Sequence, residues 1–217
     1  MKITYITAGA GGMYCGSCIR DNALATALTR KGHDVTLLPL YTPTRTDEEN
    51  VSQQRVFFGG ISVYLEQYVS LFRKTPWLLD RLWESPWLLK AVSGRAVGTS
   101  PTKLGALTVS VLEGSHGHQR KELDKLVHWL KDQPRPDVLD ISNSMLIAIA
   151  EPLKQALGCP INCTLQGENI FMDELLEPYR SRAKELIRSH LLHGGSFVAV
   201  SDYSAGYMSR DLEIPGA

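Results

Sequence analysis

The chain has 217 residues, and its 23 lysines and arginines balance 23 aspartates and glutamates to a formal net charge of zero. A chain of this length can form one large α/β domain with a sizeable core, whereas two complete domains would be cramped. The balanced charge excludes a global electrostatic field directed at nucleic acid or at an anionic membrane.

The amino terminus predicts neither a secretion signal nor a membrane anchor. Residues 1–7 run directly into a strand-like segment, without a charged leader and a small-residue cleavage site. No apolar run approaches the roughly 20 residues that cross a bilayer. We therefore expect a cytoplasmic protein with no transmembrane segment, with or without peripheral attachment to the inner membrane. Its four cysteines should be mostly reduced there.

The first forty residues predict a strand, loop, helix and second strand. The strand is 2–7 (KITYIT), followed by a glycine-rich turn over 8–16 and a helix over 17–31. The second strand is 34–40 (DVTLLPL). Apolar residues at helical spacing suggest the buried side of the helix, namely Ile19, Ala23, Leu24, Ala27 and Leu28.

The middle of the chain predicts a helical insertion around 70–131. Before it, two glycines within 56–65 (VFFGGISVYL) suggest a hairpin or an irregular loop. Residues 76–97 hold two proline-led segments that predict two short helices. A longer helix over 102–131 should be broken or bent around 114–117.

The last third returns to alternating strands and helices. Strands are expected at 137–142, 160–165 and 196–200, the last of them buried. Helices are expected at 145–157, 179–193 and 201–212, and 168–177 should be a polar loop with a helical turn. The whole chain thus predicts one α/β, Rossmann-like domain over 1–217, with a mostly parallel sheet and helices on both faces.

Parallel strands deliver their trailing loops to one edge of a sheet, where open α/β folds bind ligands. The loop after the first strand contains Gly11, Gly12 and Met13, whose backbone amides could approach a phosphate or a sugar. The alternative is a glycine turn that only packs strand against helix. A dinucleotide is disfavoured, because the third glycine of G-x-G-x-x-G would fall at Tyr14.

The remaining loops at this edge supply polar side chains that could bind a ligand. Their candidate residues are Asn143, Gln166, Glu168, Asn169 and Ser201. Glu168 and Asn169 could hydrogen-bond sugar hydroxyls or simply cap the following turn. Ser201 should cap the last helix.

Cysteines and histidines provide competing interpretations. Cys15 and Cys18 form a C-x-x-C motif at a helix amino terminus, which keeps a dithiol oxidoreductase open as an alternative function. Cys159 and Cys163 lie in or beside a strand, where buried structural cysteine is favoured over zinc binding. His116 and His118 lack a carboxylate or cysteine at a telling spacing. No metal site is therefore predicted.

Three segments resemble a known family. ITAGAGGMYCGSCIRDNALATALTRKGHDVTLLPLY resembles the opening of retaining nucleotide-sugar glycosyltransferases of the large group-1 family, which includes glycogen and sucrose synthases. FVAVSDYSAGYMSRDLEIPGA resembles the segment before their interdomain linker, and FFGGISVYLEQ resembles the glycine loop and strand of the glycogen-synthase branch.

This resemblance implies a GT-B enzyme with two Rossmann-like domains facing a cleft. The chain would be the amino-terminal, acceptor-side domain, and the donor domain with its paired E-x7-E glutamates is expected beyond Ala217. The implied donor is a nucleotide-diphosphate sugar, with no covalently bound cofactor, and the acceptor a carbohydrate or glycolipid. The isolated chain should be inactive, and no catalytic residue is assigned within it.

The resemblance also gives roles to individual positions. Gly11 and Gly12 match the family loop that nears the donor phosphates, while Gln166 and Gly167 match a motif that commonly reads His-Gly. Glutamine cannot titrate, so only a positional role is expected for Gln166. A non-catalytic sugar- or partner-binding module using the tryptophan-rich segment 77–89 is the third alternative.

Overall fold

The computed structural model describes residues 1–9, 14–68, 70, 72–73, 101–194 and 196–214. Strands in these parts form a five-stranded sheet in the order β2-β1-β3-β4-β5, and every neighbouring pair is parallel. The strands are β1 (Lys2–Thr7), β2 (Asp34–Pro39), β3 (Val138–Ile141), β4 (Ile161–Leu165) and β5 (Ser196–Ala199).

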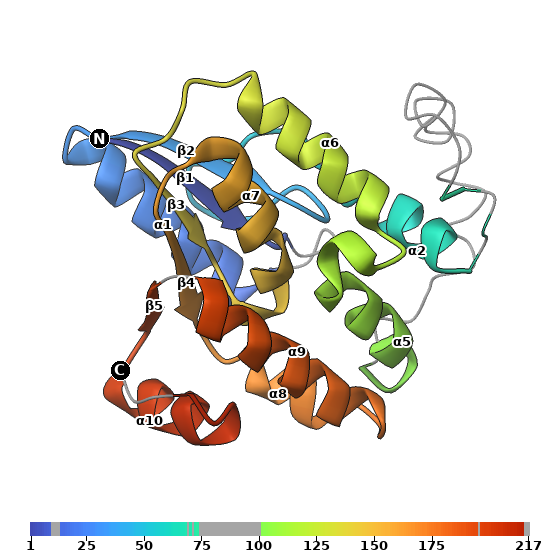
Figure 1. Cartoon of the computed structure of the whole chain (residues 1–217). Coiled ribbons are helices and arrows are strands. Elements are labelled where there is room, and N and C mark those ends of the chain that lie inside the picture. The colour runs from blue at the N-terminus through green and yellow to red at the C-terminus, as the bar shows by residue number, and fades with distance from the viewer. Residues whose placement is uncertain (10–13, 69, 71, 74–100, 195, 215–217) are drawn as a thin grey trace.

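Helices connect and cover the strands (Figure 1). The α-helices are α1 (Gly16–Arg30), α2 (Gly60–Tyr68), α5 (Pro101–Leu112), α6 (Arg120–Lys131), α7 (Ala150–Leu157), α8 (Asn169–Asp173), α9 (Tyr179–Gly194) and α10 (Asp202–Asp211). The described residues also include the 3-10 helices η2 (Gly114–His116) and η3 (Ser144–Ile149). The predicted α/β, Rossmann-like architecture with a mostly parallel sheet is therefore confirmed, and every strand pair of this sheet is parallel.

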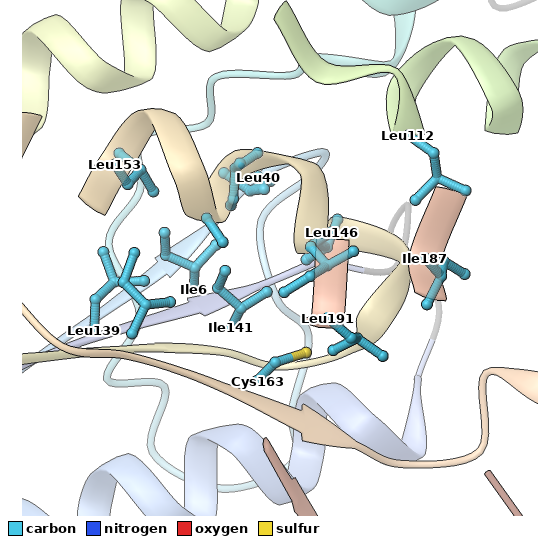
Figure 2. Close-up of a cluster of buried hydrophobic side chains, with 14 of the residues drawn as sticks. Ile6, Leu40, Leu112, Leu139, Ile141, Leu146, Leu153, Cys163, Ile187 and Leu191 are labelled. Carbon is cyan, nitrogen blue, oxygen red and sulfur yellow. The ribbon is translucent and has the colours of Figure 1, made fainter. Parts of the chain in front are cut away.

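The two faces of the sheet are covered by different helices. Side chains alternate along β1, so that Ile6 enters the main core and Tyr5 a smaller cluster with Leu37 and Ala25 of α1. The main core includes residues of α5, α6, α7, α9 and η3. Figure 2 shows this core between β1, β3 and β4 and the helices that cover them.

The buried side of α1 differs from the predicted one. Cys18, Asp21, Asn22 and Ala25 are buried, whereas Ala23 and Ala27 are exposed. Buried Asp and Asn are accepted here because both side chains are hydrogen-bonded. The Asn22 amide donates to the Glu49 carbonyl at 2.9 Å and accepts from the Val51 amide at 3.0 Å, which fixes the segment after β2 against α1.

Residues 56–65 do not form the predicted hairpin. The stretch from Gly60 is the helix α2, so the segment that resembled a glycine loop and strand is a loop followed by a helix. The backbone amides of Phe57 and Phe58 donate to the Leu40 carbonyl at 3.1 and 2.9 Å, and both rings join the main core. The apolar run therefore reflects packing beyond β2 rather than strand pairing.

The predicted break in the helix over 102–131 is confirmed. The chain forms α5 and α6, with η2 between them. A Cβ atom at Gly117 would lie 1.8 Å from the Ser110 carbonyl oxygen, so only glycine permits this close return of the chain onto α5. The two short helices predicted over 76–97 fall outside the described residues.

The last third follows the predicted order of elements with two differences. Residues 145–157 divide into η3 and α7, and Pro152 lies in the first turn of α7, where no intrahelical donor is needed. β5 is buried on one face only, because Val198 is 52% exposed while Phe197 packs against the core. No helix among the described residues has the length and apolar character required to span a membrane.

Candidate functional site

A crevice is expected where β1 and β3 lie side by side but lead to opposite faces of the sheet. β1 is followed by α1, which packs on the Tyr5 face, and β3 is followed by η3 and α7, which pack on the Ile6 face. Such a reversal separates the two trailing loops and opens a crevice beyond the carboxyl ends of the strands. The predicted site loops all follow strands at this edge.

Glu168 ties together the loops that follow β3 and β4. Its Oε1 accepts from the Ser144 amide at 2.9 Å and from the Ser144 hydroxyl at 2.5 Å, and its Oε2 accepts from the Gln166 amide at 2.8 Å. The side chain is 7% exposed. Glu168 therefore fixes the loops 142–144 and 166–169, which together are called the rim. Its predicted contact with an acceptor stays a prediction.

Asn143 and Asn169 occupy helix starts on the same rim. The Asn143 side chain caps η3 by accepting from the Met145 amide at 3.1 Å. Asn169 is the first residue of α8, directly after Glu168. Both predicted acceptor-side residues are therefore fixed by local backbone geometry at the carboxyl edge of the sheet.

Gln166 connects the rim to α1. Its Nε2 donates to the Ser142 carbonyl and, at 3.3 Å, to Asp21 Oδ1. Asp21 also accepts from the Thr7 hydroxyl at 2.7 Å and from the Tyr5 hydroxyl at 3.2 Å. The structure thus brings predicted Gln166 together with a buried carboxylate that periodicity alone did not identify.

A second carboxylate lies on the α1 side of β3. Asp140 pairs in register with Tyr5 and accepts from the Asn162 amide and from the Thr164 hydroxyl, the latter at 3.0 Å. Burial raises the pKa of Asp140 even though the Asn162 and Thr164 hydrogen bonds oppose the shift. Two acidic groups, Asp21 and Asp140, therefore lie on the α1 side of the sheet.

Arg20 and Tyr5 join these acidic groups. The Arg20 guanidinium donates from Nη1 to the Tyr5 hydroxyl at 2.6 Å and to Asp21 Oδ1 at 3.1 Å. Burial, followed by the charges of Asp21 and Asp140, raises the pKa of Tyr5 well above its ordinary value. Tyr5 therefore remains a neutral phenol, which donates to Asp21 and accepts from Arg20.

Sequence reasoning missed Tyr5, Arg20, Asp21 and Asp140. A signal for Asp21 existed, because Cys18, Asp21 and Ala25 recur at helical spacing just as the apolar residues do. For Asp140, the signal was a charged residue in the middle of the strand VLDI, which indicates that one face of this strand is polar.

Two glycines shape the turns that follow the strands. Gly9 has φ +80°, and a Cβ atom there would lie 1.9 Å from the Thr42 carbonyl oxygen. Gly167, between Gln166 and Glu168, has φ +96°. Both positions require glycine for backbone reasons. The predicted phosphate-binding residues Gly11, Gly12 and Met13 lie outside the described residues.

Ser201 follows β5 at the same edge as the other predicted residues. It caps α10 as expected, and its hydroxyl accepts from the Ser204 amide at 3.2 Å. Ser201 is exposed, as is Tyr203 beside it, whose side chain is 81% exposed. In the described parts of the chain, Ser201 forms no hydrogen bond to Glu168 or Gln166, so it is not part of the hydrogen-bonded loops after β3 and β4.

The cysteines separate into two kinds. Cys159 and Cys163 are buried in the main core, as predicted, and burial raises the pKa of each thiol. Cys15 is the N-cap residue of α1 and is partly exposed, while Cys18 is buried in the first turn. All four are free thiols.

Metal-ligating side chains do not gather in the described parts of the chain, where no three His, Cys, Asp or Glu residues form a potential site. His118 contacts Gln67 Oε1 through Nδ1 at 3.2 Å, and burial followed by the Arg73 charge lowers its pKa. The adjacent His116 is exposed. Comparison with known proteins adds no assignment, since no family model and no curated protein matches the chain.

Proposed function

We propose that the chain is the acceptor-side domain of a retaining glycosyltransferase, which moves a sugar from a nucleotide-diphosphate sugar to a carbohydrate or glycolipid acceptor. One observation carries the proposal. Two features that match the family, the glycine loop with Gly11 and Gly12 and the pair Gln166–Gly167, follow β1 and β4, and both strands end at the same edge of the sheet. The resemblance and the topological rule for open α/β sheets thus point to the same edge of the sheet.

The rim offers groups that suit a sugar and its phosphates. α1 is 15 residues long and begins directly after the loop that resembles the donor-phosphate loop. The positive end of its dipole would stabilise the charge that accumulates on a departing nucleotide diphosphate. The polar groups of 143–144 and 166–169 would bind acceptor hydroxyls from the neighbouring strands.

Rigidity of the rim supports a positioning role. Glu168 holds the β3 and β4 loops through three hydrogen bonds, and Gln166 anchors the same loop to α1. Precise placement of two substrates can supply a large part of the rate acceleration in a transfer reaction. We assign Gln166 to this positioning function, because its amide cannot act as a general acid or base.

The direct test is a transfer assay on the protein carrying the second domain that the resemblance implies. We expect label from UDP-glucose, ADP-glucose or GDP-mannose to reach an oligosaccharide or glycolipid acceptor, and none to be transferred by residues 1–217 alone. Gly12→Leu should abolish most transfer in a protein that still folds, while Gly32→Ala, beyond the opposite end of α1, serves as the control. Full transfer by the folded Gly12→Leu variant would contradict the role of the loop.

A second test uses the chain alone. Amide resonances are followed by NMR while maltopentaose or one of the same nucleotide sugars is added. Shifts should concentrate in residues 142–144, 166–168 and 201–204, at the carboxyl edge. The amides of Gly32 and Asp137, near the opposite ends of the strands, are the internal control. Shifts concentrated at those control amides would contradict the proposed site.

The alternative of a sugar-binding module makes a different prediction. Its segment, residues 77–89, lies outside the described residues. Ligand would then change the tryptophan fluorescence and the indole resonances without affecting the amides at 142–144 and 166–168. The two functions are therefore distinguished in the same titration.

A further inference from the structure

Cys15 and Cys18 occupy unequal environments at the start of α1. Cys15 is the N-cap residue, with an extended backbone (φ −130°, ψ 124°), and the residue is partly exposed. Its Sγ lies 2.9 Å from the Ser17 hydroxyl oxygen. Cys18 is only 1% exposed and lies behind it, in the first turn of the helix. Cys15 is therefore the member of the pair with surface exposed to solvent.

The two thiols are also close neighbours. Each perturbs the pKa of the other. Residues three apart in a helix have Cα atoms about 5 Å apart. This separation falls within the range of about 4.4–6.8 Å found across disulfides. A Cys15–Cys18 disulfide consequently needs side-chain rotation and a small adjustment of the first turn, not a rearrangement of the fold.

Local interactions make the thiols chemically different. Burial raises the pKa of Cys15, but hydrogen bonds from the Ser17 hydroxyl and from the backbone and thiol of Cys18 outweigh it, so the net pKa is lowered. Burial, with the neighbouring Cys15, raises the pKa of Cys18 to about 12. The thiolate is the reactive form of cysteine, and it is favoured at the exposed position.

We propose that Cys15 and Cys18 form a reversible thiol–disulfide exchange site for small-molecule disulfides, in which Cys15 attacks and Cys18 resolves. The observations that carry it are the partly exposed N-cap Cys15, the buried Cys18 behind it and their helical spacing. The inference stands apart from the transferase proposal, because none of these three observations depends on a sugar substrate.

The exchange balances in two steps. The Cys15 thiolate attacks one sulfur of a disulfide RS–SR, whose S–S bond breaks, and RS⁻ leaves with the bonding pair. Cys18 then gives its proton to the departed thiolate and attacks the Cys15 sulfur of the mixed disulfide, releasing the second RS⁻, which takes the proton that Cys15 had lost to solvent. Two protein thiols are oxidised to one disulfide, and RS–SR is reduced to two RSH.

The experiment adds glutathione disulfide to the intact chain and follows its mass. The wild-type protein should lose two hydrogens, with the disulfide mapped to the peptide containing both residues, and dithiothreitol should reverse the change. Cys18→Ser should accumulate one glutathione on Cys15, because the resolving thiol is absent. Cys15→Ser should form neither product. Cys163→Ser is the matched control and should behave as wild type.

The expected rates provide a second readout. Iodoacetamide should modify Cys15 faster than the other cysteines at pH 7. Ser17→Ala should slow this reaction, roughly tenfold if the pKa of the Cys15 thiol rises by one unit. If Cys18→Ser fails to fold, Cys18→Ala replaces it, with the circular dichroism spectrum as the criterion. Absence of a glutathione adduct on Cys15 in a folded Cys18 variant would overturn the proposal, as would preferential reaction at Cys159 or Cys163.

Discussion

The Gln166 side chain donates from Nε2 to Oδ1 of Asp21 at 3.3 Å, joining residues that are 145 positions apart in the sequence. Gln166 follows β4 on the rim, and Asp21 is fully buried on α1. This hydrogen bond couples the stability of the α1 side of the sheet to the shape of the proposed binding edge. The coupling can be tested without knowing the substrate.

Gln166→Glu should destabilise the protein strongly at neutral pH. It replaces a donor with a carboxylate beside the buried charge of Asp21 and removes the bond to the Ser142 carbonyl. We expect a loss of about 3 kcal/mol in the free energy of unfolding. Because the like charge raises the pKa of the new carboxyl, the loss should grow as the pH rises above about 4.3.

The matched control for this substitution is Gln155→Glu on α7. Gln155 is exposed and donates to Glu151 Oε1 at 3.1 Å, so the change again creates adjacent like charges. In solvent this pair should cost only about 0.2–0.5 kcal/mol. Urea unfolding of both variants at pH 5 and pH 8 gives the comparison. Equal losses in the two variants would show that Asp21 is not the cause.

A second prediction concerns Gly9, in the turn after β1. Gly9→Ala places a methyl group 1.9 Å from the Thr42 carbonyl oxygen and also strains a residue at φ +80°. Gly32→Ala suffers similar strain, at φ +86°, with no heavy atom within 4 Å of the new Cβ. The strain alone costs about 1–2 kcal/mol.

Urea unfolding should therefore rank the two glycine variants. Gly9→Ala must lose clearly more free energy of unfolding than Gly32→Ala, because only Gly9 meets backbone atoms. Gly16→Ala, at a helical position with open space around its Cβ, should be neutral or stabilising by up to about 1 kcal/mol. Similar losses for Gly9→Ala and Gly32→Ala would contradict the close approach of Thr42.

The elements of the sheet were readable from the sequence because their patterns are local. Alternation of strand and helix signals fixed the parallel order of segments, and Gly117 marked the break before α6. The polar cluster was not readable, since Asp21 meets Thr7 and Gln166 only through the sheet order. The helix α2 was missed for another reason: its residues ISVYL have strand-like propensity, and tertiary packing overrides propensity.

A third prediction concerns the hydroxyl of Tyr5, which accepts from Arg20 at 2.6 Å and donates to Asp21 at 3.2 Å. Tyr5→Phe should reduce the free energy of unfolding by about 1–3 kcal/mol, because a buried donor and acceptor lose their partner. Tyr203→Phe removes the same atom from a side chain that is 81% exposed. It should have no measurable effect, and a Tyr5→Phe variant as stable as Tyr203→Phe would contradict the network.

The last prediction concerns a buried carboxyl group away from the crevice. Glu66 of α2 is 1% exposed and lies 3.4 Å from the Lys121 ammonium, with Glu122 and Lys125 forming a neighbouring pair at 2.7 Å. Burial, with the Glu122 charge, raises the pKa of Glu66 to about 7. Between about pH 4.5 and 7 the folded state therefore keeps a proton that the unfolded state has lost.

The contribution of protonated Glu66 to the free energy of unfolding should be fully present below about pH 4.5 and should be lost as the pH rises through about 7. Relative to Glu66→Gln, which cannot ionise, the wild-type protein should lose on the order of 3 kcal/mol between pH 5 and pH 8. Glu177→Gln is a control of opposite sign, since hydrogen bonds from Ser181 and Arg180 lower the pKa of exposed Glu177. The free energy of unfolding that the wild-type protein gains over Glu177→Gln should be lost as the pH falls. A pH-independent difference between wild type and Glu66→Gln would mean that Glu66 stays ionised inside the fold.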